Sequence, residues 1–148
     1  MRPMNRACCN EKLLKKKGVG LTPHRQVVFE IFSSSPKTFT AQRILEKIRK
    51  KRTMDKVTLY RILDLFVAKR IIRRLSASQG SLRYEIICDE HHPFHPHFIC
   101  RDCGKMECLN DIDLSSLRHS IQKKRHLEGE DIDLKLEGLC FRCRKTKI

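Results

Sequence analysis

The chain has 148 residues, of which 32 are Lys or Arg and 17 are Asp or Glu, and its formal net charge is +15. This length suits one domain or two very small ones, whose modest core a metal or a partner chain would help to stabilise. The composition, 40% hydrophobic and 33% charged, excludes a disordered chain. No apolar run is long enough to span a membrane and the start lacks a secretory pattern, so we expect a cytoplasmic protein without a membrane partner.

The basic excess lies in one part of the chain. Residues 1–87 hold 21 Lys and Arg against six Asp and Glu, whereas residues 88–148 hold eleven of each. Six of the eight cysteines and six of the seven histidines lie at or after position 88. We therefore expect two domains, residues 1–87 built for a polyanion such as nucleic acid and residues 88–148 built for a metal.

The first segments in chain order are an arm and two helices. Residues 1–10 are predicted to be a loose arm in which Cys8 and Cys9 fit no ligand spacing, and a short helix is expected over 10–17. Thr22 followed by Pro23 predicts the start of the next helix, because threonine caps helices and proline suits the first helical position. Its apolar face has 3/4 spacing and comprises Val27, Val28, Ile31 and Phe32.

Two further helices are predicted in this domain. Thr40 caps one of them, and its buried side is Ile44, Leu45 and Ile48. The other spans residues 56–68 with an apolar stripe of Leu59, Ile62, Leu63 and Phe66. The opposite side of this last helix is polar and carries Lys56, Thr58, Tyr60, Arg61 and Asp64.

Two short β-like runs, residues 71–75 and 82–87, flank a turn segment that contains Gly80 and so predict a hairpin. Three helices followed by a hairpin is the order of a winged helix-turn-helix, whose last helix enters the major groove of DNA. On this interpretation Tyr60 and Arg61 contact DNA, together with Thr58 and Lys56 on the same side of the helix. The alternative is an ordinary amphipathic helix with a solvated charged face, and the charge asymmetry favours DNA.

The second domain is predicted to be small and α+β. Strands are expected over 97–100 and 105–109, joined by a turn at Gly104. Residues 113–125 predict a helix whose apolar face is Leu114, Leu117 and Ile121. Ile132, Leu134 and Leu136 alternate with charged residues, which indicates a half-buried strand that could pair with its copy in another chain.

Two CxxC pairs, Cys100 with Cys103 and Cys140 with Cys143, predict a structural zinc site, because zinc takes four thiolates in a closed tetrahedral set. Such a site would join distant strands and supply folding energy to a small domain. The alternatives are disulfides or redox-active CxxC motifs, and a reducing cytosol favours the metal.

His95 and His97 form a second signal, because residues i and i+2 of a strand point to one face and could share a metal. The nearest spare thiols are Cys88 and Cys108, and nearby N or O donors include Glu85 and Glu107. A Cys/His set favours zinc, whereas a His/carboxylate set favours iron or manganese. The alternative is that these are surface histidines and small buried cysteines.

Four segments, GLTPHRQVVFEIF, VTLYRILDLF, HFICRDCGKMECL and LKLEGLCFRC, occur in the order and spacing of the ferric-uptake-regulator (Fur) superfamily, which the chain resembles over roughly residues 10–144. The resemblance implies a homodimeric, metal-sensing repressor of α+β fold. Such a protein has an N-terminal winged helix-turn-helix and a small α/β dimerisation domain, and it binds a palindromic operator in double-stranded DNA. It also implies one structural zinc per chain on the four cysteines of the CxxC pairs.

The chain departs from the pattern of the iron sensors of that family. Where they take a regulatory histidine this chain has Thr38, and where they take a carboxylate after CGK it has Cys108. Their accessory metal site matches Phe94 and Pro96, so no accessory site is expected. The lysine that they place in the minor groove is Gly20 here, which leaves residues 15–17 or Arg25 for that contact.

The resemblance therefore points to the zinc-responsive (Zur-like) branch, because Cys88 resembles the wing-end cysteine of its sensors. The predicted sensory site is His95, His97 and Cys88, completed by Cys108 or Glu85, and its metal is zinc, with iron or manganese as the alternative. Redox sensing through Cys88 and Cys108, or no sensing at all, is the remaining alternative. A metal at this place would fix the angle between the domains and hence the spacing of two recognition helices.

Two other classes of protein are alternatives to a metal-sensing repressor. An enzyme such as a zinc deaminase needs an H-x-E motif and an open metal position, which this sequence does not supply, so a non-enzyme is expected. A non-regulatory zinc-ribbon protein that binds nucleic acid by charge alone would show strong salt dependence with little sequence preference.

Overall fold

A computed structural model describes residues 11–35, 37–88 and 94–147 and divides into two compact units. The first unit holds residues 11–76 and 81–88 of the described chain, and the second holds 77–80 and 94–147. The domain boundary predicted between residues 87 and 88 lies beside the undescribed residues 89–93 and stays a prediction. The predicted arm with Cys8 and Cys9 lies outside the described residues. No helix in the described part is long and apolar enough to cross a membrane.

The first unit contains four helices, α1 (Glu11–Lys16), α2 (Pro23–Ser33), α3 (Ala41–Arg49) and α4 (Lys56–Ala68). Three of them begin at the predicted points because a side chain caps each start. Thr22 accepts a hydrogen bond from the backbone N–H of Arg25 at 3.3 Å, and Thr40 accepts one from that of Arg43 at 3.2 Å. Asp55 caps α4 in the same way.

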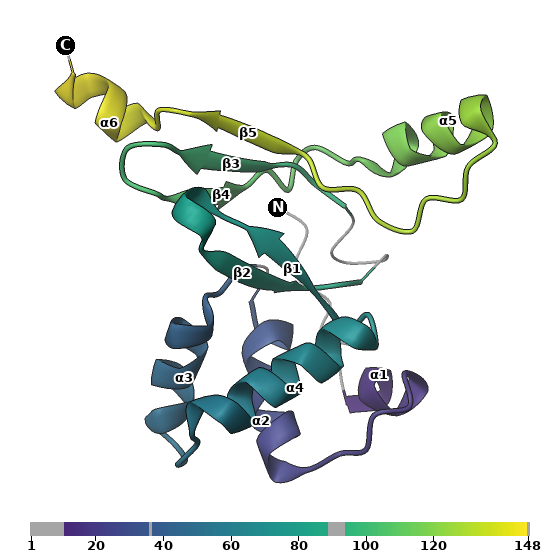
Figure 1. Ribbon diagram of the computed structural model, residues 1–148, viewed down its shortest axis with the longest axis vertical. Helices are drawn as coiled ribbons and strands as arrows, with labels where there is room; N and C mark the ends of the chain where they lie inside the picture. The colour runs from purple at the N-terminus through teal and green to yellow at the C-terminus, as the bar shows by residue number, and fades with distance from the viewer. Residues whose placement is uncertain (1–10, 36, 89–93, 148) are drawn as a thin grey trace. The chain divides into compact units, whose positions relative to one another are not determined.

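A two-stranded antiparallel sheet follows α4, formed by β1 (Ile72–Ser76) and β2 (Leu82–Ile86) around a short 3₁₀ turn, η1 (Ser78–Gly80) (Figure 1). Gly80 takes a left-handed φ of 73°, which glycine adopts without a steric penalty. We call this β1–β2 sheet the wing. Phe39 and Tyr84 exchange two backbone hydrogen bonds of 2.9 and 2.8 Å, which connect the segment before α3 to the wing.

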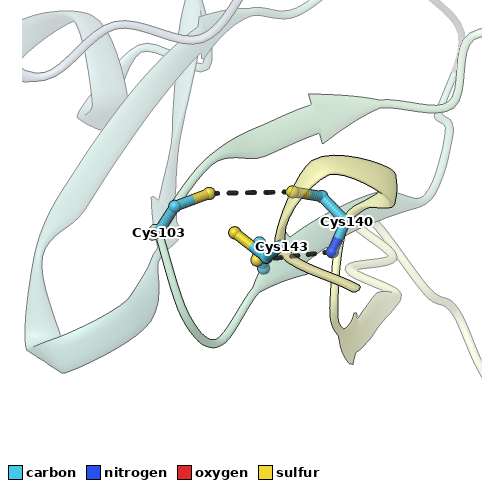
Figure 2. A group of neighbouring side chains, drawn as sticks. Cys103, Cys140 and Cys143 are labelled. Carbon is cyan, nitrogen blue, oxygen red and sulfur yellow. Dashed lines mark hydrogen bonds between the residues drawn. The ribbon is translucent and has the colours of Figure 1, made fainter. Parts of the chain in front are cut away.

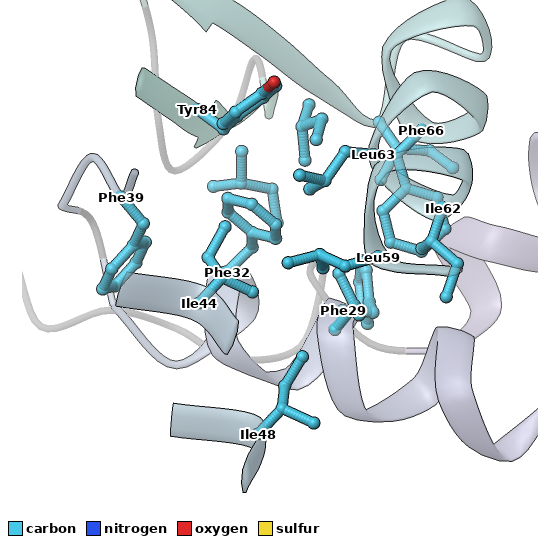
Figure 3. Close-up of a cluster of buried hydrophobic side chains, with 14 of the residues drawn as sticks. Phe29, Phe32, Phe39, Ile44, Ile48, Leu59, Ile62, Leu63, Phe66 and Tyr84 are labelled. Atoms are coloured by element: carbon cyan, nitrogen blue, oxygen red, sulfur yellow. The ribbon is translucent and has the colours of Figure 1, made fainter. Parts of the chain in front are cut away.

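The core of the first unit is a single cluster of buried apolar side chains from α2, α3, α4 and the wing (Figure 3). The predicted stripes of α3 and α4 are buried as expected. In α2 the buried residues are Val28, Phe29 and Phe32, whereas Val27 and Ile31 are only partly buried. Phe29, which the sequence pattern missed, is buried in this core.

The second unit contains β3 (His97–Cys100), β4 (Met106–Cys108), α5 (Ser115–Arg125), β5 (Lys135–Gly138) and α6 (Phe141–Thr146). Its strand order is β4-β3-β5, with β4 antiparallel and β5 parallel to β3. The predicted turn at Gly104 has a left-handed φ of 72°. Helical and sheet units in this order confirm the predicted α+β class, a winged helix-turn-helix followed by a small α/β domain.

The C-terminal elements differ from the prediction in three places. The expected strand over 132–136 begins only at Lys135, although the His97 N–H already donates to the Leu134 carbonyl oxygen at 2.9 Å. The helix expected from Asp113 begins at Ser115, and the Asp113 carboxylate accepts a hydrogen bond from the Ser115 N–H at 2.8 Å. The helix α6 was not expected at all.

Two of the three residues predicted to form the apolar face of α5 are exposed in the single chain, whereas Leu114, which precedes the helix, is buried. Leu117 and Ile121 are 42% and 44% exposed, and Leu136 on the edge strand β5 is 59% exposed. Large apolar side chains on an edge strand and a neighbouring helix are typical of a surface that another protein chain covers.

Candidate metal centres and nucleic-acid interface

The exposed face of α4 carries most of the residues predicted to contact DNA. Lys56, Tyr60 and Arg61 are exposed, and Tyr60 shows 47% of its surface. Val57, which the sequence analysis missed, is 60% exposed on the same helix and could contact a thymine methyl group. The sequence feature that could have indicated Val57 is an apolar residue that lies outside the buried stripe of the helix.

Two other predicted contact residues have partners within the first unit. The Thr58 hydroxyl donates to the Asp55 carboxylate at 2.9 Å, so it takes part in the cap of α4. This hydrogen bond and that from the Thr58 backbone N–H hold the pKa of Asp55 below its usual value. Arg25 donates from Nη1 to the Gly20 carbonyl oxygen at 2.9 Å.

The four cysteines of the two CxxC pairs meet at one place in the second unit. Figure 2 labels three of them, Cys103, Cys140 and Cys143. Cys100 ends β3, Cys103 lies in the turn after it, and Cys140 and Cys143 lie at the start of α6. All four sulfurs lie within 4.8 Å of one another, and the sulfurs of Cys103 and Cys140 are 3.9 Å apart. Four sulfurs at about 2.3 Å from one zinc would be about 3.8 Å apart, so the donor set fits tetrahedral zinc.

Backbone amides prepare this cluster for negative charge. The N–H groups of Cys103 and Cys140 point to the Cys100 sulfur and lower the pKa of that thiol to about 6. The Cys140 N–H donates to the Cys100 sulfur at 3.4 Å. Cys100 is fully buried, and burial alone would raise the pKa of its thiol. Hydrogen bonding with Cys140 and with the Asp102 carboxylate raises the pKa of the Cys143 thiol. Thiolate is the form that binds a metal, so the lowered pKa of Cys100 favours a cation here, whereas Cys143 would release its proton when the metal binds.

A second donor group lies at the other end of the same strand hairpin. His95, His97 and Cys108 offer ligand atoms within 4.8 Å of one another. Both imidazoles are buried, at 4% and 1% exposure, and their ring centroids are 4.7 Å apart. Cys108 is the direct cross-strand partner of His97 in the β3–β4 register, which places both side chains on one face. Two imidazoles and one thiol form a donor set that suits zinc.

The remaining predicted sensory residues belong to the first unit. Cys88 is partly buried and packs against the hydrophobic core there. Glu85 on β2 faces Arg73 on β1, and the two side chains form a buried ion pair with 4% and 7% exposure. Their participation in one site with the donors of the second unit stays a prediction.

The positions where the chain departs from the family pattern are occupied as follows. Arg83 donates to the Thr38 hydroxyl at 3.4 Å. The Phe94 ring is buried, and the Arg118 guanidinium lies 4.9 Å from its centroid. A cation–π contact of this kind stabilises packing and supplies no metal ligand.

A winged helix-turn-helix joined to a unit with two metal-donor groups defines a class, the metal-binding winged-helix proteins. Residues 16–137 match the model of the Ferric uptake regulator family, and the chain belongs to this family.

Known members are similar along most of their length. The Ferric uptake regulation protein of Helicobacter pylori (strain ATCC 700392 / 26695) is 27% identical over 135 residues, which cover 90% of this chain and 88% of that protein. The Peroxide operon regulator of Bacillus subtilis is 28% identical, with 90% of each chain covered. A solved structure of Helicobacter pylori Fur, reported to reveal three functional metal binding sites, has a TM-score of 0.73 at 26% identity and covers 97% of each chain.

Proposed function

We propose that this protein is a zinc-responsive, sequence-specific DNA-binding repressor of transcription that acts as a homodimer. Membership of a family of metal-dependent regulators supports the class. The observation that carries the choice of zinc is the pairing of Cys108 with His97 across the β3–β4 hairpin, beside His95. Sulfur in this position is a soft donor, which zinc accepts and which manganese does not favour.

The charge of Glu85 also supports zinc over iron or manganese. The two harder metals favour carboxylate ligands, and Glu85 is the carboxylate that the sequence offers for the sensory site. Arg73 already neutralises it in a buried ion pair. Because the Arg73 guanidinium already draws on the charge of this carboxylate, Glu85 is a weaker donor to iron or manganese than a carboxylate without such a partner.

The cysteine cluster has a separate, structural role in this proposal. Cys100, Cys103, Cys140 and Cys143 would hold one zinc per chain, which would cross-link the end of β3 to the start of α6. The low pKa of the Cys100 thiol favours its deprotonated form near neutral pH. The cluster offers four ligands and needs no further one, so it is closed to substrate.

DNA recognition is assigned to α4. Tyr60, Arg61 and Lys56 on its exposed face would meet the major groove, and Arg25 would contact the DNA nearby. Two copies of the chain, joined through the exposed faces of α5 and β5, would read the two halves of a palindromic operator. If metal binding raises affinity for the operator by some factor, operator binding must raise metal affinity by the same factor.

The test is a metal-titrated DNA-binding assay on operators found by footprinting genomic fragments with the full-length protein. We expect protected palindromes, and affinity for them at least 10-fold higher with zinc than after removal of the sensory metal. His97→Ala and Cys108→Ser should abolish this difference, whereas His119→Ala on the exposed surface of α5 should keep it. Equal affinity with and without metal would exclude a sensor, and uniform protection of all fragments would indicate the zinc-ribbon alternative. A stronger response to manganese or iron than to zinc would overturn the assigned metal.

A further inference from the structure

The first unit has a basic groove that the recognition helix does not include. The C-terminal half of α2, the segment after it and one side of α3 line this groove, whose volume is about 840 Å³. Its charged lining consists of five cations and one carboxylate, namely Lys37, Arg43, Lys47, Lys50, Lys51 and Glu30. We infer that the α2–α3 groove is a second contact for DNA, one that binds the phosphate backbone outside the major-groove contact of α4. This inference rests on the proposed function.

The cations of the groove are placed as a row. Arg43 and Lys47 lie on α3, and Lys50 directly follows its last residue with helical backbone angles, so the three share one side at spacings i, i+4 and i+7. Ile44 and Ile48 occupy the other side and point into the core (Figure 3). Seven residues of helix extend about 10.5 Å, and one DNA strand places a phosphate about every 3.4 Å along its axis. The row therefore matches about three successive phosphates.

Most of this positive charge is available to a ligand. Arg43 pairs with Glu46 at 3.2 Å on the surface, an ion pair of small net value. Lys37, Lys47, Lys50 and Lys51 form no ion pair with a carboxylate in the described part of the chain. The Lys47 ammonium lies 5.7 Å from the centroid of the Phe39 ring, which fixes its direction without cancelling its charge.

DNA suits this groove because of where the groove lies along the chain. In a helix-turn-helix the helix before the recognition helix crosses the DNA backbone, and α3 holds that place before α4. Lys50 and Lys51 lie only a few residues before Lys56, where α4 begins. Lysine contacts to phosphate carry no sequence information, so this surface supplies affinity and position while α4 supplies specificity.

The experiment measures how the affinity of the full-length protein for a mixed-sequence 30-base-pair duplex depends on NaCl concentration. Each phosphate contact adds about 0.9 to the slope of log affinity against log salt. Lys47→Gln/Lys50→Gln should lower that slope by about 1.8 per subunit and weaken binding about 10- to 100-fold at 0.1 M NaCl. The matched control, Lys123→Gln/Lys124→Gln in the last turn of α5, removes the same charge from the second unit and should leave the slope unchanged.

Further measurements separate the possible outcomes. Lys50→Gln/Lys51→Gln leaves the Lys47–Phe39 contact in place and should reproduce the loss of slope, with an unchanged melting temperature. An unchanged slope in both groove variants would overturn the inference. If pyrophosphate at constant ionic strength raises the melting temperature of the wild type but not of the variants, and the slope is unchanged, the groove binds a free anion and not DNA. A lower slope without any metal response at an operator would retain the groove and reject the proposed function.

Discussion

The two units are stabilised in different ways. In the first, eighteen apolar side chains from the helices and the wing form one buried cluster. In the second, the buried apolar residues of the described chain are few, namely Phe94, Ile99, Leu114, Cys100 and Cys143. Eight of the twelve large apolar side chains that are exposed in the described chain also belong to the second unit.

This difference predicts that the second unit depends on a metal or on a partner chain for its stability. A domain of fewer than about 70 residues rarely buries enough apolar surface to be stable alone, and metal ions or a partner chain commonly make up the deficit. The first unit has its own core and should fold without either. The DNA-binding surface and the metal chemistry are thus supported by separate sources of stability.

The largest expected effect is on the cysteine cluster. Cys103→Ser/Cys140→Ser should lose one zinc per chain and unfold the second unit, because a structural zinc contributes on the order of 10 kcal/mol. Zinc content by mass spectrometry and hydrogen exchange by peptide will measure this. Cys9→Ser, which removes a thiol that fits no ligand spacing, is the control and should keep the zinc. Protected amides in the second unit of the double variant would show that it does not depend on zinc.

A substitution in the hydrophobic core should destabilise the first unit and leave the second unit intact. Phe32 is fully buried, and Phe32→Ala should lower the free energy of unfolding of this unit by about 3–5 kcal/mol while the cysteine cluster keeps its zinc. Denaturant unfolding followed by helical circular dichroism is the measurement. Phe141→Ala removes a ring that is 66% exposed and should leave this transition unchanged. Equal losses for the two variants would mean that the units do not have separate cores.

The exposed apolar face of α5 tests the contribution of a partner chain. Leu117→Glu/Ile121→Glu should weaken dimerisation by about 3 kcal/mol, or roughly 100-fold, because two charges would be buried without partners. Sedimentation velocity over a concentration series measures the dimer. His119→Glu, also exposed on α5, is the control and should remain dimeric. A dimer of unchanged affinity in the double variant would place the interface elsewhere.

The smallest expected effect is on a helix N-cap in the first unit. Thr40→Ala removes the hydrogen bond that caps α3 and should cost about 1 kcal/mol in stability. Thermal unfolding of the first unit is the measurement. Thr53→Ala, exposed and outside any helix, should cost little. A loss for Thr53→Ala as large as that for Thr40→Ala would remove the cap as the explanation.

The sequence predicted the first unit better than the second because the first depends on local signals. Thr22 and Thr40 fixed helix starts, and the 3/4 spacing fixed most of the core, with Phe29 as the exception. In the second unit Leu117 and Ile121 are exposed in the described chain. Their periodicity therefore predicted a helix but could not identify the surface that they pack against. Helix α6 has only six residues, of which three are basic, and no apolar stripe, so the sequence pattern did not indicate it.

The candidate sites were predictable to the extent that spacing decides them. Two CxxC pairs suffice for the cysteine cluster, whatever the path of the chain between them. Placing Cys108 opposite His97 requires the register of a hairpin, and the sequence offered Cys108 only as one of several nearby donors. The hydrogen bond from the Thr58 hydroxyl to Asp55 depends on the geometry of the helix cap. The pattern of polar residues along the helix face does not reveal that geometry.

The cysteine cluster also closes a loop. Cys103 and Cys140 are separated by 36 residues, and this segment contains α5 and β5 with their exposed apolar side chains. Bringing the ends of such a segment together costs roughly 3 kcal/mol of chain entropy, which a cross-link removes from the folding equilibrium. A reagent that reacts only with these thiols would therefore release the segment that carries the expected dimer surface. The oligomeric state of the protein would then report on thiol chemistry that takes place outside the dimer interface.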